Sequence, residues 1–190
     1  METISDEQLA ARLQRGDRLA LNTLVDRHYD PLIGYLYRLL GGDRDRALDL
    51  VQETFLRALR GIERYDRSRP FKPWLYAIAT HLARDQAARA DNRRVQAWHE
   101  GIDPPDDDPS QEAALLDAEN AQQVQAALAQ LPLEQREVVI LFYYQDLSQY
   151  EIAQALAVPL GTVKSRLHQA VRRLRGLLEI AALRVPQEER

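Results

Sequence analysis

The strongest constraint on the fold of this chain is a short stretch that is rich in acid and proline and has little to bury. Residues 101–109 read Gly-Ile-Asp-Pro-Pro-Asp-Asp-Asp-Pro, and residues 95–119 carry eight acidic side chains and no Lys or Arg. Like charges repel and prolines extend a chain, so this composition is typical of a linker. The alternative is an ordered surface loop, although loops of this length are uncommon inside compact domains. We therefore predict two domains, residues 1–92 and 112–190, joined by an acidic flexible linker over residues 93–111.

Composition excludes several classes of function. The chain has no cysteine, which excludes a disulfide scaffold, a cysteine-ligated zinc site and a thiol nucleophile. Its four histidines show no metal-ligand spacing, and the sequence has no phosphate-binding glycine loop, so we expect no metal or cofactor. The longest apolar run, residues 138–144, is far too short to span a bilayer, and the acidic N-terminus lacks the apolar core of a secretion signal. We expect a cytoplasmic protein with no membrane insertion.

The net charge of −4 conceals basic regions in both predicted domains. Because residues 95–119 contribute eight negative charges, the rest of the chain has a net charge of +4. Clustered Arg and Lys attract the phosphates of nucleic acid. The overall acidity therefore does not exclude a nucleic-acid partner.

Apolar residues recur at spacings of three and four on both sides of the linker, which predicts helices. Ser5 and Ser148 each begin a capping-box pattern, completed three residues later by Gln8 and Glu151. Pro31 is expected to kink or restart the second helix. Strand-like alternation is absent from the sequence, so we predict an all-α fold. The expected helices cover residues 5–13, 17–40, 43–59, 74–89, 110–130, 132–144, 149–157 and 161–178, with a loop over 61–73.

The last two predicted helices have the spacing of a helix-turn-helix, because only the turn 158–160 separates them. Five basic side chains and no acid lie between Leu160 and Leu178. On a helical wheel the apolar residues form one stripe, and polar and basic groups occupy the opposite side, as in a helix that enters the DNA major groove. A bundle helix with a solvated basic face is the alternative, but such faces usually mix both signs. The candidate DNA contacts are Thr162, Lys164, Ser165, Arg166, His168, Gln169, Arg172 and Arg173.

The predicted loop before the fourth helix interleaves basic side chains with aromatic rings. The basic ones are Arg64, Arg67, Arg69 and Lys72, and the rings are Tyr65, Phe71, Trp74 and Tyr76. Single-stranded nucleic acid binds where its bases stack on rings while cations follow its backbone. The same rings can close a small core instead. For Trp74 the pattern favours the core, whereas for Tyr65 and Phe71 it leaves both roles open.

A compact polar patch is expected on the third helix. Asp49, Gln52 and Glu53 are spaced so that they share one helical face. Paired carboxylates can carry out acid/base catalysis, and an exposed patch of this kind can also contact another protein. From spacing alone, a solvated face without a specific role is the favoured interpretation.

Taken in order, these motifs resemble the extracytoplasmic-function (ECF) group of bacterial RNA polymerase sigma factors, over about residues 5–90 and 112–178. Residues 49–55 (Asp-Leu-Val-Gln-Glu-Thr-Phe) are similar to the family's polymerase-binding helix. The pattern Phe71, Trp74-Leu75, Ile78-Ala79 and Asp85 is similar to its minus-ten helix. The second half matches the family's minus-thirty-five domain at Leu131-Pro132, Arg136, Glu151-Ile152-Ala153 and residues 161–167 (Gly-Thr-Val-Lys-Ser-Arg-Leu).

The resemblance implies a non-catalytic initiation subunit that directs core RNA polymerase to promoter DNA and helps to open it. Asp49, Gln52 and Glu53 would dock on the clamp helices of the largest polymerase subunit, and the last helix would read the minus-thirty-five element. The linker would run toward the RNA exit path, and an anti-sigma protein is an expected partner. A base flipped from the melted strand would be held by the loop 64–72. The implied minus-ten contacts are Arg64, Tyr65, Arg67, Arg69, Phe71, Lys72, Trp74, His81 and Asp85.

The chain departs from the family pattern in places, and two other functions remain as alternatives. His81 stands where the family often has Asn, Asp146 replaces a usual turn glycine, and the turn 158–160 is stiffer than in many members. A stand-alone helix-turn-helix regulator with an N-terminal sensor or dimerisation domain would bind specific DNA tightly without polymerase. An enzyme that uses Asp49 and Glu53 would place both acids in a concave, buried pocket.

Overall fold

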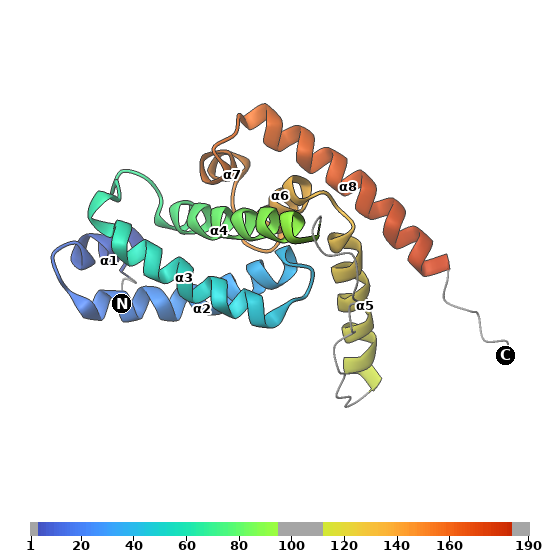
Figure 1. Ribbon diagram of the computed structural model, residues 1–190, viewed down its shortest axis with the longest axis horizontal. Coiled ribbons are helices and arrows are strands. Elements are labelled where there is room, and N and C mark those ends of the chain that lie inside the picture. Colours follow the sequence, from blue (N-terminus) through green and yellow to red (C-terminus); the bar gives the residue numbers. More distant parts are fainter. Residues whose placement is uncertain (1–3, 95–111, 184–190) are drawn as a thin grey trace.

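Figure 1 shows the computed structural model, which describes residues 4–94 and 112–183. Within these two ranges every regular element is a helix, which confirms the predicted all-α fold. In chain order the elements are α1 (Asp6–Leu13), α2 (Arg18–Leu39), α3 (Arg44–Gly61), the short 3₁₀ turn η1 (Ile62–Arg64), α4 (Phe71–Arg94), α5 (Glu112–Ala129), α6 (Leu133–Tyr143), α7 (Gln149–Leu156) and α8 (Leu160–Leu183). No helix within these ranges is both long and apolar enough to cross a membrane.

The first three helices begin at side chains that the sequence marks as caps. The Ser5 hydroxyl accepts the main-chain N–H of Gln8, and the Gln8 side chain accepts the N–H of Ser5 in return, which closes a capping box. Asp17 and Asp43 each accept a main-chain N–H from the first turn of α2 and α3. Each cap satisfies a donor that the helix itself leaves without a partner.

Two prolines lie inside helices of the first domain. Pro31 does not restart α2, which runs through it for 22 residues, because buried side chains on both sides, such as Leu24 and Leu32, hold the helix against the core. α4 begins at Phe71 rather than near residue 74, so the predicted loop is shorter. Pro73 therefore lies in the first turn of α4, where main-chain N–H groups have no helical partner and proline is tolerated.

The second domain contains the predicted helix-turn-helix. Ser148 and Glu151 close the second capping box at the start of α7. After α7, Ala157 adopts a left-handed conformation with φ of 53°, and α8 begins at Leu160. Buried side chains of both helices, including Ile152 and Val163, join the core.

The two domains pack directly against each other (Figure 1). α4 contacts α7, and α2 contacts both α5 and α6. The buried side chains of the two domains form one continuous cluster, which extends from Leu9 in α1 to Ala170 in α8. The predicted linker, except for residues 93 and 94 at the end of α4, lies outside the described residues.

Candidate nucleic-acid interface

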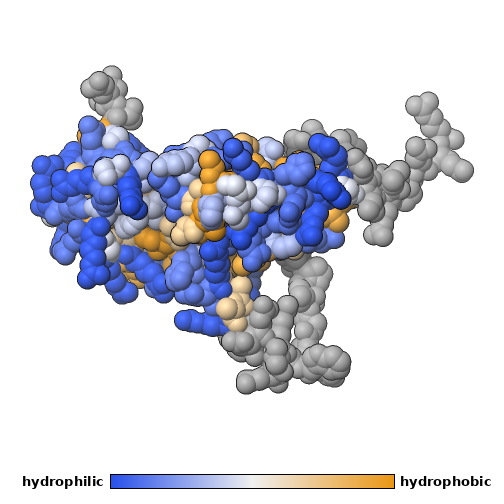
Figure 2. All heavy atoms as spheres, turned by 90° about the horizontal axis from the view of Figure 1, so that it is seen from above, coloured by the Kyte–Doolittle hydropathy of each residue, from blue (hydrophilic) through white to orange (hydrophobic). Residues whose placement is uncertain are grey.

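The first half of α8 is buried on one side and exposed on the other, as its helical wheel predicts. Val163, Leu167 and Ala170 are buried in the domain core. Viewed from the side of α7 and α8, the surface of the molecule is largely hydrophilic (Figure 2). A helix with this exposed row is shaped and charged to enter a major groove. The exposed side chains are Lys164, Ser165, His168, Gln169, Arg172 and Arg173.

Thr162 and Arg166 differ from this row because both are half-buried. The Nη1 atom of Arg166 is buried, and no hydrogen-bond partner for it is found among the described residues. The Thr162 carbonyl accepts the Ser165 hydroxyl at 3.0 Å. Gln135 of α6 donates from its amide to Oε1 of Gln169 at 3.0 Å. α6 therefore helps to position the exposed face of α8.

Tyr65 and Phe71 are both buried, so the structure favours the core over direct base stacking for the two rings that the sequence left open. Their rings meet edge-on with centroids 5.6 Å apart, and both contact Trp74. The Tyr65 hydroxyl donates to the carbonyl of Arg69. Burial, with a smaller effect from the charge of Glu7, raises the pKa of Tyr65 to about 12, so this donor keeps its proton at neutral pH.

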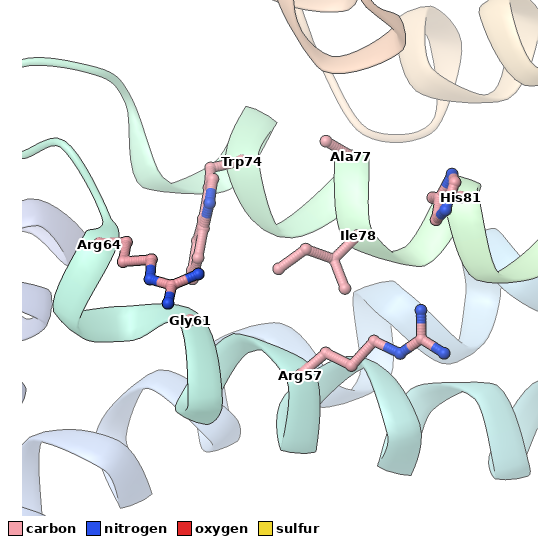
Figure 3. Close-up of a pocket in the computed structure, with 7 residues that line it drawn as sticks. All are labelled: Arg57, Gly61, Arg64, Trp74, Ala77, Ile78 and His81. Carbon is pink, nitrogen blue, oxygen red and sulfur yellow. The ribbon is translucent and has the colours of Figure 1, made fainter.

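Trp74, for which the sequence favoured the core, is only half-buried and lines a cleft between α3 and α4 (Figure 3). Trp74 and Ile78 extend from α4 toward α3, and a Cβ at Gly61 would lie 3.6 Å from the indole. An aromatic wall, an apolar floor and nearby cations are what an unstacked nucleobase and its phosphate require. The cleft has a volume of about 460 Å³ and is lined by Arg57, Gly61, Arg64, Trp74, Ala77, Ile78 and His81.

Gln14, which the sequence analysis did not single out, holds the segment between α3 and α4 in place through hydrogen bonds. The Gln14 amide donates to the carbonyls of Ile62 and Tyr65, at 2.6 and 3.0 Å, and its oxygen accepts Arg67 Nε. Gln14 and Ile62 are 48 residues apart, so no local pattern marks this contact. Arg69 lies 3.5 Å from the nearby carboxylate of Asp66 and is highly exposed. Contacts within the fold therefore partly fix the positions of Arg67 and Arg69.

Of the other side chains on α4 that were predicted to contact the minus-ten element, one contacts the second domain and the others lie at the surface. Lys72 Nζ donates to the carbonyl of Gln145 at 2.6 Å, so the second domain already engages this amine. His81 is exposed, and its Nε2 lies 3.6 Å from the carboxylate of Asp85, one turn along the helix. Sequence reasoning missed Arg57 as a cleft residue. The sequence signal that could have found it is its position four residues after Glu53, one turn along the same helix.

The predicted acidic patch lies on α3. Asp49 and Gln52 are exposed, and Glu53 accepts Nε of Arg57 at 2.8 Å with 36% of its side chain exposed. The enzymatic alternative requires both acids to be buried in a concave pocket, and Asp49 and Glu53 do not meet that requirement. An accessible polar face of this kind suits a contact with another protein.

Two family models match the chain in the order of its two domains. Sigma-70 region 2 matches residues 24–93, which include the cleft, and Sigma-70 region 4 matches residues 121–174, which include the helix-turn-helix. The chain is 34% identical over 182 residues to the ECF RNA polymerase sigma factor SigW of Bacillus subtilis, and the match covers 88% of this chain and 93% of SigW. The chain belongs to the ECF RNA polymerase sigma factors. This membership confirms the resemblance drawn from the sequence and does not favour the stand-alone regulator.

The sigma factor has further relatives. It is 39% identical over 167 residues to the ECF sigma factor SigE of Mycolicibacterium smegmatis, a match that covers 86% of this chain and 64% of SigE. The chain thus spans less than two thirds of that relative. Among solved structures it is similar to CnrH in complex with the cytosolic domain of CnrY, with a TM-score of 0.70 and 27% identity over 92% of this chain and 97% of CnrH. It is also similar to RpoE in complex with the anti-sigma factor NepR from Bartonella quintana, with a TM-score of 0.68 and 25% identity over 84% of this chain and 96% of that one.

Proposed function

We propose that this sigma factor binds core RNA polymerase, recognises two promoter elements and promotes strand opening for transcription initiation. One observation carries the proposal. The chain belongs to this family, its first domain has an aromatic cleft lined by cations, and its second domain has a helix that can enter the DNA major groove. The proposed limits are residues 1–92 for region 2, residues 93–111 for the linker and residues 112–190 for region 4.

The proposed polymerase-binding surface is the exposed face of α3. Asp49, Gln52 and Glu53 lie on this face, and Leu56 follows one turn after Gln52 with 48% of its surface exposed. An exposed leucine beside charged and amide side chains is typical of a protein interface, where an apolar centre is surrounded by polar groups.

For the minus-ten element, we propose that Trp74 is the ring on which an unstacked promoter base stacks. Arg57, Arg64 and His81 at the rim of the cleft would accompany the phosphates of the strand. Tyr65 and Phe71 contribute indirectly, because they pack against Trp74 and hold its indole in place. Arg67, Arg69, Lys72 and Asp85 remain proposed contacts along the same strand.

For the minus-thirty-five element, we propose direct readout by the exposed face of α8. Arg can donate two hydrogen bonds to guanine, and Gln can pair with adenine, so Arg172 and Gln169 are the side chains best suited to read bases. Lys164, Arg173 and the main-chain N–H groups near Thr162 are suited to contact phosphates.

An anti-sigma protein is the third proposed partner. The similar chains CnrH and RpoE were solved in complex with CnrY and with the anti-sigma factor NepR. The likeness to CnrH covers 92% of this chain and therefore spans both domains. An inhibitor that binds both domains at once would suit this arrangement.

A single charge reversal on α3 tests the polymerase contact. Glu53→Arg is expected to abolish co-purification with core RNA polymerase and to leave the helical circular-dichroism signal unchanged, because the side chain is partly exposed. Asp26→Arg, at an exposed acid on α2, is the matched control and should bind as the unmodified chain does. Retained binding of Glu53→Arg would contradict docking through α3. Failure of the unmodified chain to bind core polymerase at micromolar concentration would overturn the proposed function.

A further inference from the structure

One hydrogen bond connects the buried side of the second domain to the exposed face of its last helix. α6 and α8 pack against each other (Figure 1). At this contact the NH2 group of Gln135 donates to Oε1 of Gln169 at 3.0 Å. Gln135 is only 8% exposed, whereas Gln169 lies in the exposed row of α8. A buried residue that cannot reach DNA itself therefore holds one that is proposed to read bases.

The position of Gln135 is fixed by the first turn of α6. Its main-chain N–H donates to the carbonyl of Pro132 at 3.0 Å. The next residue, Arg136, donates to the carbonyls of Leu131 and Leu39, at 3.0 and 2.7 Å. These hydrogen bonds tie the turn to the segment before it and to the end of α2. The amide of Gln135 therefore extends from a rigid element.

Gln135 is not the side chain that packing alone would favour at this position. Its Oε1 is buried and has no hydrogen-bond partner among the described residues. A buried polar atom without a partner costs free energy, which an apolar side chain of similar length, such as Met, avoids. The observed orientation of the amide is the less costly of two, because turning it over would bury an NH2 group with two unpaired donors in place of one oxygen.

The same hydrogen bond decides which end of the Gln169 amide is free. Its oxygen is directed at Gln135, and its NH2 group makes no hydrogen bond to any of the described residues. A glutamine that is free to turn pairs with adenine through its oxygen and its NH2 group together. The oxygen of Gln169 can accept a second hydrogen bond, but an oxygen held toward the domain does not face the same base edge as the NH2 group. What remains for the groove is a donor, and guanine offers two acceptors there, N7 and O6.

We propose that Gln135 is a positioning residue for promoter recognition, which holds Gln169 as a hydrogen-bond donor and so makes it select guanine over adenine in the minus-thirty-five element. Cytosine is disfavoured at the same position, because its N4 amino group is itself a donor. The inference rests on the proposed function of α8 and names the base chemistry of one of its contacts. Gln135 itself touches no base.

The first test follows the Gln169 amide in the full chain, without polymerase or DNA. The two N–H signals of this side chain are identified in nuclear magnetic resonance spectra by their loss in Gln169→Met. In the unmodified chain the amide is expected to be restricted, and in Gln135→Met it should become flexible, with an order parameter below about 0.6. Gln130→Met, at an exposed glutamine outside this contact, is the matched control and should leave the amide restricted. Equal mobility in the unmodified chain and in Gln135→Met would overturn the positioning role.

The second test measures base preference with the reconstituted holoenzyme and minus-thirty-five elements in which each position carries each of the four bases in turn. At the position that loses its discrimination in Gln169→Met, the unmodified chain should prefer guanine. Gln135→Met should weaken the preference for guanine over adenine about fivefold, the effect of one hydrogen bond on an equilibrium constant. Added to Gln169→Met, it should have no further effect. An unchanged preference in Gln135→Met, or a preference for adenine in the unmodified chain, would overturn the proposal.

The two proposals can fail separately. If neither Gln169→Met nor Arg172→Ala alters discrimination at any position, direct readout by α8 is wrong, and the selection of guanine is overturned with it. If Arg172→Ala alters discrimination and Gln169→Met does not, readout by α8 stands and only the inference about Gln135 is overturned.

Discussion

The carboxylate of Glu7 in α1 accepts the main-chain N–H of Phe71 at 3.0 Å, so a side chain from the first helix caps the first turn of α4. These residues are 64 positions apart in the sequence. Trp74 and Ile78 follow on the same helix and form one wall of the cleft. The position of α1 therefore determines where α4 starts and, through it, where the cleft wall stands.

Removing this cap should destabilise the first domain. Glu7→Ala is expected to lower the free energy of unfolding by about 1 kcal/mol, the usual value of a helix cap. Urea denaturation followed by circular dichroism measures the change. Glu63→Ala, at an exposed acid on η1, is the control and should have little effect. Equal stability of Glu7→Ala and the unmodified chain would contradict the capping role.

The neighbouring acid gives the first domain an acid-sensitive contact. Asp6 accepts Nε2 of the buried His28 at 2.7 Å and Nη1 of Arg27 at 2.8 Å. The hydrogen bond from His28 is the main cause that lowers the pKa of Asp6 below 3.8, against the opposing effect of burial. The contact therefore stabilises the fold above pH 3.8, and the stabilisation is lost as the pH falls through the lowered value.

Asp6→Asn should accordingly be less stable than the unmodified chain by about 1.5–3 kcal/mol at pH 7, the range for a hydrogen bond to a charged group. The difference should shrink when the same urea titration is repeated at successively lower pH values below 3.8. A difference that stayed constant across this range would show that the carboxylate charge is not what stabilises the contact.

Local sequence patterns predicted the helices because their causes are local. The capping boxes at Ser5 and Ser148 and the apolar stripe of α8 depend on residues within a few turns of one another, and the structure confirms all three. The relative burial of Tyr65 and Trp74 could not be ranked correctly in this way, because burial of these rings depends on how α1, α3 and α4 pack. The domain contact through Gln145 was equally invisible, since it joins segments 69 and 114 residues apart.

The turn of the helix-turn-helix contains a strained residue whose replacement should stabilise the second domain. Ala157 adopts φ of 53°, a left-handed conformation that is unfavourable by about 1–2 kcal/mol for a residue with a Cβ. Ala157→Gly is expected to raise the free energy of unfolding by about 0.5–1 kcal/mol, the difference between the relieved strain and the added freedom of the unfolded chain. Gln154→Gly, inside α7, should change stability in the opposite direction, by about 1 kcal/mol. Thermal unfolding compares the two, and a loss of stability in Ala157→Gly would contradict the prediction.

The two arginines Arg166 and Arg172 on α8 should have different roles. Arg172 is exposed, so Arg172→Ala should weaken recognition of the upstream promoter element by about 1–3 kcal/mol if its guanidinium pairs with a guanine. Arg166 is half-buried, so Arg166→Ala should mainly lower the thermal stability of the second domain. Promoter discrimination is measured by competition between the cognate element and single-base variants with the reconstituted holoenzyme. Unchanged discrimination in Arg172→Ala would remove this residue from the reading set.

If Trp74 is the stacking ring, its replacement should impair strand opening, whereas replacement of a buried neighbouring ring should impair stability. Trp74→Leu keeps an apolar side chain on α4 but removes the indole, so it should weaken strand opening by about 1–3 kcal/mol per stacked base. Phe71→Leu, at a buried ring, should instead lower the free energy of unfolding by about 1 kcal/mol. Permanganate reactivity of unpaired thymines in the open complex, compared with closed-complex binding of the same holoenzyme, measures the first effect. If Phe71→Leu impaired opening as strongly as Trp74→Leu at equal stability, the stacking surface would have to include the buried rings as well.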